Sequence, residues 1–82
     1  MASAASGMTR AVRIMDHGDG RDVVLPATRV VALADHGDGL TLIQVDDGTA
    51  DGSHMVARVD VAELARALGW DVETVGPPVV KL

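Results

Sequence analysis

The pentapeptide Asp-His-Gly-Asp-Gly occurs twice in this 82-residue chain, at residues 16–20 and again at residues 35–39. A run of apolar residues that suits a β-strand precedes and follows each copy. Aspartate and glycine tolerate positive φ angles and form side-chain-to-backbone turn bonds, so each copy predicts the tip of a β-hairpin. The repeat therefore restricts the first half of the chain to two hairpins in series.

The apolar runs around the two copies predict four strands, and a turn-rich loop at residues 46–53 separates them from a fifth. Pro26 marks the break between the second and third strands because proline cannot donate a ladder hydrogen bond. Valine dominates the apolar residues, which also favours strands. The predicted strands are residues 11–15, 23–25, 30–34, 40–45 and 54–59.

After the fifth strand the spacing of apolar residues changes to the period of a helix. Asp60 and Glu63 have the spacing of a capping box, and Gly69 is a typical stop after the last turn. The apolar stripe between them consists of Val61, Leu64, Ala65 and Leu68. The sequence predicts an α+β fold that is mainly β: an antiparallel meander of four or five strands with one C-terminal helix over residues 61–68.

The length of the chain allows one small domain, which we expect over residues 9–75. A leader of small residues is predicted over 1–8 and a Pro-containing tail over 76–82. The chain has no cysteine, so neither a disulfide nor a thiolate metal site can support the core. Either the core is sufficient by itself or a second copy of the chain completes it.

Both faces of the central strands are apolar in the sequence, and one short helix covers only one of them. The second face must be buried either by curling into a half-barrel or by a second subunit, so we predict a homodimer. Trp70 is either a core plug or an interface anchor, and the last four residues are either free or added to a sheet edge. The predicted contact residues are Val30, Ala32, Ile43, Val45, Trp70, Val79, Val80 and Leu82.

The two repeated turns also raise the hypothesis of a metal site, because alternate turns of a meander emerge at the same end. Carboxylate oxygens suit calcium or magnesium, and imidazole suits zinc or nickel. The candidate ligands are Asp16, His17, Asp19, Asp35, His36 and Asp38. The simpler interpretation is that these are turn residues only, since their spacing matches neither an EF-hand nor a zinc motif. We expect no cofactor.

The chain offers few side chains that could act in catalysis. Cysteine is absent, and Ser53 and His54 are neighbours on a predicted strand, so their side chains point to opposite faces. Most carboxylates lie in turns, where we expect water to solvate them. A domain of this size also leaves little room for a ligand pocket. We therefore predict a protein that is not an enzyme.

The charge and composition suggest where such a protein works. The net charge is −5, and the seven basic residues are scattered, which disfavours nucleic acid as a partner. No apolar run is long enough to span a membrane and no signal peptide is present, so we expect a cytoplasmic protein. Arginine outnumbers lysine and aspartate outnumbers glutamate, as is typical of a high-GC bacterium or its phage.

Residues 21–26, 29–34 and 40–48, followed by the helix from Asp60, resemble the opening half of LytTR-type DNA-binding domains. The same pattern, over residues 10–69, is similar to the small flagellar FlbD-like proteins. The LytTR resemblance implies a DNA-binding transcriptional regulator as an alternative, in which folding gathers several arginines: Arg10, Arg13, Arg21 and Arg29. The main prediction is a protein-interaction module with an accessory or regulatory role, whose partners are itself and another protein.

Overall fold

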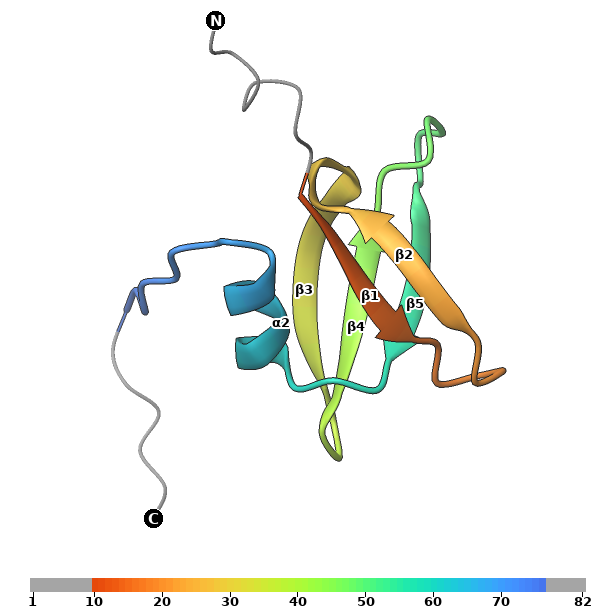
Figure 1. Ribbon diagram of the computed structural model, residues 1–82. Coiled ribbons are helices and arrows are strands. Elements are labelled where there is room, and N and C mark those ends of the chain that lie inside the picture. The colour runs from red at the N-terminus through yellow and green to blue at the C-terminus, as the bar shows by residue number, and fades with distance from the viewer. Residues whose placement is uncertain (1–9, 77–82) are drawn as a thin grey trace, which may run out of the picture.

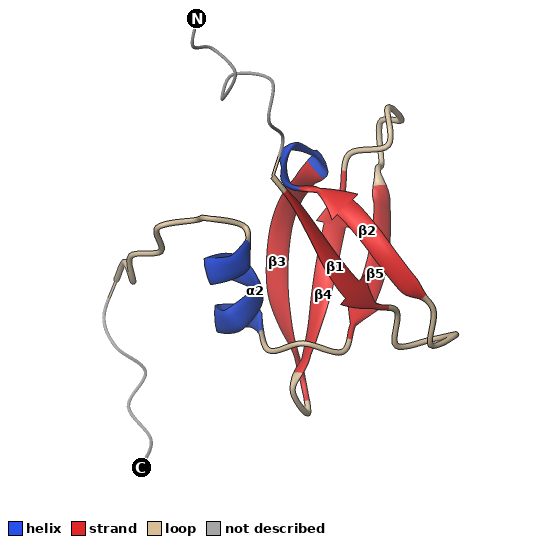
Figure 2. Ribbon diagram, viewed as in Figure 1, coloured by secondary structure: helices blue, strands red, loops and turns tan. Residues whose placement is uncertain are grey.

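Five antiparallel strands and one α-helix make up the part of the chain that the computed structural model describes, residues 10–76 (Figure 1). The strands are β1 (Ala11–Met15), β2 (Asp22–Pro26), β3 (Val30–Gly37), β4 (Leu40–Val45) and β5 (Ser53–Ala57), and the helix is α2 (Val61–Ala67). One turn of 3₁₀-helix, η1 (Ala27–Arg29), joins β2 to β3 (Figure 2). The predicted mainly-β class with one C-terminal helix is confirmed.

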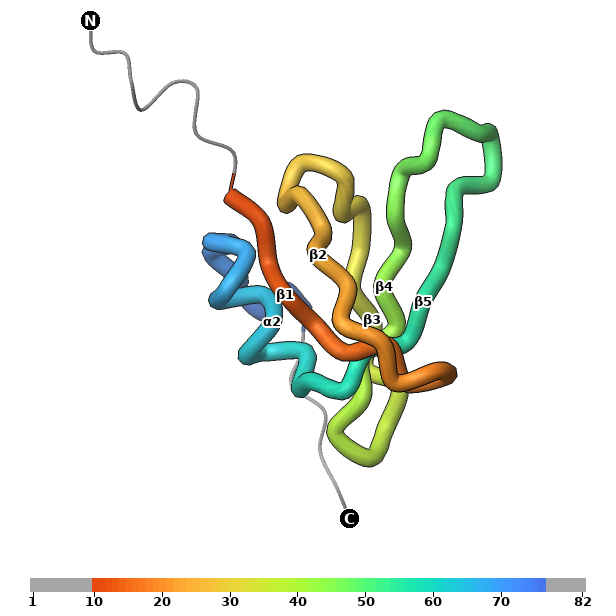
Figure 3. Tube along the Cα trace, turned by 45° about the vertical axis from the view of Figure 1, so that its right-hand side comes forward, coloured from red at the N-terminus to blue at the C-terminus, as the bar shows by residue number. Residues whose placement is uncertain are grey.

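The five strands divide into two sheets, a two-stranded β1–β2 hairpin and a three-stranded β3–β4–β5 meander. The sheets meet at one corner, where the amide of His17 donates to the carbonyl of Val56 (2.7 Å) and that of Arg58 donates to Met15 (2.9 Å). From this corner the hairpin crosses the three-stranded sheet (Figure 3). Among the described strands, β2 and β3 share no ladder, so the curled arrangement stays open.

The hairpin and the helix bury their apolar side chains against the same face of the three-stranded sheet. Their shared cluster consists of Val12, Ile14, Val30, Ile43, Ala57, Leu64 and Leu68. Thr41 on β4 is also fully buried, and its hydroxyl donates to the carbonyl of Val59 (2.7 Å). This bond satisfies the buried polar group and ties β4 to the connection that leads into α2.

Three of the residues predicted to contact a second subunit belong instead to this core. Ile43 has 0 % exposed surface, Val30 is buried, and Val45 is half-buried and packs against the cluster. Val30 and Ile43 are therefore not available to a second subunit, because the β1–β2 hairpin covers this face of the sheet. The core of one chain already uses these side chains.

Ala32 is exposed and lies on the opposite face of the sheet from Ile43. The ladder between β3 and β4 shifts register between Val30 and Ala32, and a shift of one residue moves a side chain to the other face. A shallow hollow on this outer side is lined by Ala32, Leu33, Ala34, Leu42, Gln44 and His54. This hollow has a volume of about 80 Å³, so it is much smaller than a ligand pocket.

The predicted leader and the predicted contact residues Val79, Val80 and Leu82 lie outside the described residues, as do residues 1–9 and 77–82 in general. Between residues 10 and 76, no helix has the length and apolar character needed to cross a membrane.

Candidate protein-interaction groove

The ends of helix α2 are fixed by the residues that the sequence indicated. Asp60 is the N-cap, and its side chain accepts a hydrogen bond from the amide of Ala62 (3.1 Å). After the last turn Gly69 has a φ of 82°, a left-handed conformation that favours glycine. The amide of Gly69 donates to Arg66 and that of Trp70 to Ala65, both at 3.0 Å, which is the Schellman pattern. This pattern holds Trp70 beside the helix.

Trp70 and the segment that follows form one wall of an open groove along α2. The groove has a volume of about 560 Å³ and is lined by Leu33, Val61, Ala62, Ala65, Arg66, Trp70 and Val72. In Figure 1 this segment leaves the end of α2 and runs away from the strands. The groove lies on the surface between elements and so takes no space within the small core.

The lining of the groove is apolar except for one guanidinium, that of Arg66. Trp70 and Val72 line it, whereas Asp71 and Glu73, which alternate with them along the chain, do not. Trp70 is 37 % exposed, so it is not a buried core plug. Val72 and Val75 are 69 % and 88 % exposed, so residues 10–76 leave the apolar surface of the wall largely uncovered.

Arg66 and the apolar groove residues Leu33, Val61, Ala65 and Val72 were not among the candidates chosen from the sequence. The alternation of Trp70 and Val72 with Asp71 and Glu73 is a two-residue period that could have identified the wall. No local signal identifies the rest of the groove, since it depends on where α2 lies relative to β3.

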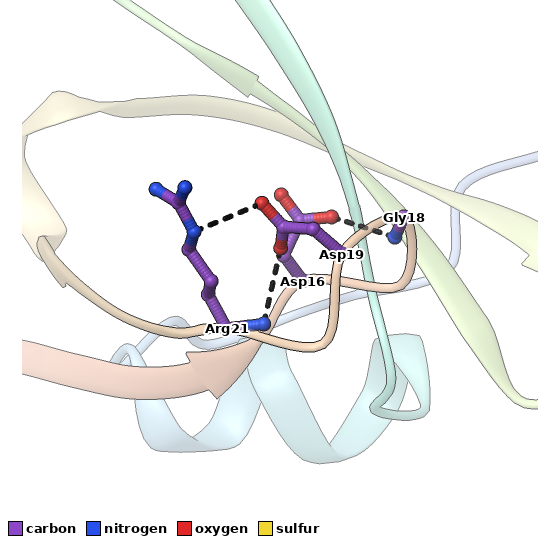
Figure 4. Close-up of polar contacts among 4 residues, drawn as sticks. All are labelled: Asp16, Gly18, Asp19 and Arg21. Carbon is purple, nitrogen blue, oxygen red and sulfur yellow. Dashed lines mark hydrogen bonds and ion pairs between the residues drawn. The ribbon is translucent and has the colours of Figure 1, made fainter.

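The two Asp-His-Gly-Asp-Gly copies form hairpin tips, as predicted. In the first copy, a carboxylate oxygen of Asp16 accepts from the amide of Gly18 (2.7 Å), and one of Asp19 accepts from the amide of Arg21 (3.0 Å; Figure 4). Asp19 also pairs with the Arg21 guanidinium at 3.3 Å, an exposed ion pair of little weight for stability. These carboxylates act as turn residues.

The six candidate metal ligands do not come together into one site. Within residues 10–76 there is no group of three or more histidine, aspartate or glutamate side chains that could hold a metal ion. The two tips belong to different sheets, and the sheets cross, so the single meander that would have aligned them is not formed. As in the first copy, Asp35 of the second accepts a bond from a turn amide, that of Gly37 (2.9 Å).

Asp47 organises the loop between β4 and β5. Its carboxylate accepts hydrogen bonds from the hydroxyls of Ser53 and Thr49 and from the amide of Thr49 (2.9 Å). The Ser53 hydroxyl, followed by the Thr49 hydroxyl, lowers the pKa of Asp47 to about 2. The Ser53 hydroxyl is therefore paired with a carboxylate, and its neighbour His54 takes the next position along β5, on the opposite face. With its pKa lowered to about 2, the Asp47 carboxylate is a weak base for activating the Ser53 hydroxyl.

The arginines that the DNA-binding alternative would gather do not form one patch. Arg10 donates to the carbonyl of Ala67 at the end of α2 (3.2 Å), and Arg29 donates to the carbonyl of Asp46 (3.3 Å). Arg21 lies at the far end of the β1–β2 hairpin from Arg10, because Met15 pairs with Asp22 and Ala11 with Pro26. That hairpin is about 16 Å long at 3.3 Å per residue. The expected cluster is thus not formed.

Comparisons with known proteins return no relative of this chain. No protein-family model matches it, and searches of the curated proteins and of the solved structures find no match. The resemblance to LytTR-type domains and FlbD-like proteins therefore stays a prediction.

Proposed function

We propose that this chain is a non-enzymatic protein-interaction module that acts as a homodimer in an accessory or regulatory role. The observation that supports this function is the open groove beside α2, whose apolar lining includes the only tryptophan of the chain. A partly exposed tryptophan in an apolar surface depression is typical of the centre of a protein contact. The dimer presents its remaining surface to another protein.

The chemistry of the groove supports binding over catalysis. Its lining has one ionisable group, Arg66, which stays protonated at neutral pH and so cannot act as a general base. The lining also has no hydroxyl or carboxylate that could serve as a nucleophile. Apolar contact is what such a surface can provide, and a protein partner can supply the complementary apolar area.

Sedimentation equilibrium at micromolar concentration tests the homodimer. The wild-type chain is expected at about twice the chain mass of 8.5 kDa. Val72→Asp places a charge on the wall of the groove and is expected to give a monomer. Val24→Asp is the matched control, because Val24 is also exposed but lies on β2 and outside the groove. A monomeric wild-type chain would contradict the proposal, and equal effects of the two variants would show that the groove is not the dimer contact.

A further inference from the structure

The geometry points to a specific occupant of the groove, namely the same groove of a second copy of this chain. In this arrangement a twofold axis relates the copies, and residues 70–75 of each copy lie across helix α2 of the other. The inference rests on the proposed homodimer and assigns its contact surface. Three features of the described residues carry it: an uncovered wall, an apolar lining and a charge at the rim that the wall can complement.

The wall, residues 70–75, carries apolar surface that the rest of the described residues, 10–76, leave exposed. Val72 and Val75 are the two most exposed large apolar residues between residues 10 and 76. Over 71–76 no backbone or side-chain group makes a hydrogen bond to another described residue. Within the described part of the chain, an occupant that contacts this segment therefore buries apolar area without breaking a hydrogen bond.

The lining of the groove is apolar, like the wall. Val61, Ala62 and Ala65 present small side chains along one side of α2, so that another chain segment can approach the helix closely. Leu33 adds apolar surface from β3. Apolar wall and apolar lining therefore match each other, and in a twofold dimer each match is formed twice.

The charges at the rim favour a second copy over an unrelated apolar partner. Arg66 forms no ion pair with any residue of the described part of the chain. Asp71 and Glu73 are exposed, and they alternate with the side chains that line the groove. A wall laid across the α2 of another copy brings carboxylates towards the unpaired guanidinium, and the twofold axis repeats this pairing. The chain thus carries both halves of the complementary surface.

A charge-reversal cycle tests this arrangement by measuring the dimer dissociation constant. Arg66→Glu alone, and Asp71→Arg combined with Glu73→Arg, each place like charges together at two symmetric positions. Each variant is expected to weaken the dimer about tenfold, since exposed pairs contribute modestly and each occurs twice. The variant with all three substitutions restores opposite charges and is expected to return the dissociation constant towards that of the wild type.

Arg13→Glu is the control for net charge, because Arg13 is exposed on β1 and does not line the groove. It is expected to leave dimerisation unchanged. The inference is overturned if Arg66→Glu dimerises like the wild type, if the triple variant is no tighter than the single and double ones, or if Arg13→Glu weakens the dimer equally. In those cases a dimer still forms and the proposed function survives. A wild-type chain that stays monomeric overturns both, whether its groove proves to bind another protein or a small apolar molecule.

Discussion

Helix α2 has two apolar sides with opposite environments. Leu64 and Leu68 point into the core, where they are 2 % and 4 % exposed. Val61 and Ala62 line the open groove, together with the exposed wall after the helix. In the sequence Val61, Leu64 and Leu68 form one stripe, so amphipathicity alone does not separate the two roles. An apolar position on a helix thus indicates that its side chain is buried in a contact. Only the tertiary structure shows whether that contact is with the core of the same chain or with a partner.

The largest effect is expected from a substitution on the side of α2 that faces the core. Leu64→Asp buries a carboxylate in the apolar cluster, which costs several kcal/mol. A chain of this size has a total stability of about 4–8 kcal/mol, at roughly 0.05–0.1 kcal/mol per residue. Circular dichroism is therefore expected to show a largely unfolded chain. Ala62→Asp places the same charge at an exposed position on the same helix and should leave the spectrum unchanged. A normally folded Leu64→Asp variant would mean that α2 is not docked on the sheet.

A smaller effect is expected when side chains in the core and in the groove are truncated to alanine instead of being replaced by a charged residue. Ile43→Ala leaves a cavity at a fully buried position and should cost about 2–5 kcal/mol of stability. Val72→Ala removes an exposed side chain and should change stability by less than about 0.5 kcal/mol. Thermal melts at a concentration that favours the monomer measure both without the contribution of dimerisation. Similar melting temperatures for the two variants would remove the distinction between core and groove.

The single tryptophan gives a spectroscopic measure of the groove side. Trp70 is 37 % exposed in one chain, and a second copy across the groove would remove water from the indole. Dilution through the dimer dissociation range should therefore move the fluorescence emission of the wild type to longer wavelength. Val72→Asp should show the long-wavelength emission at every concentration. An emission maximum that is independent of concentration while the chain still dimerises would place the contact elsewhere.

The elements of this fold could be predicted because short-range signals set them. The Asp38–Gly39 turn has positive φ at both residues, which closes a two-residue hairpin between Gly37 and Leu40. In the same way Asp60 begins α2 and Gly69 ends it. Aspartate and glycine act here through their own backbones, so the sequence is enough to locate them.

The register of the strands and their division into two sheets could not be predicted, because both depend on contacts between distant residues. The first copy of the repeat makes a longer turn than the second: the amide of Asp16 donates to Arg21 (2.8 Å) and that of Gly20 donates to Asp16 (2.9 Å). Identical pentapeptides thus form different turns, since the register of the flanking strands differs. The irregularity before Ala32 likewise reversed the face expected for that residue.

The groove could be anticipated only in part. Trp70 was a candidate contact residue from its type and its position after the helix stop, and it lines the groove. The rest of the surface is assembled from β3, α2 and the wall, whose relative placement follows from how the hairpin and helix share one sheet face. The sequence predicted that the contact surface lies on a face of the sheet. The β1–β2 hairpin covers that face in the structure.

The smallest expected effect concerns the two Asp-His-Gly-Asp-Gly turns, which belong neither to the core nor to the groove. The core cluster holds the domain together, and we predict that no bound ion contributes, so a chelator is expected to leave the melting temperature unchanged. The carboxylates of Asp16, Asp19 and Asp35 already accept bonds from turn amides. A metal at a hundredfold excess over its dissociation constant would add about 2.7 kcal/mol, so its removal would lower the melting temperature by about 10 °C or more. Replacing His17 and His36 together with alanine is the matching variant. A chelator that lowers the melting temperature of the wild type by several degrees, and leaves that of the double variant unchanged, would show that the two tips do bind a metal ion.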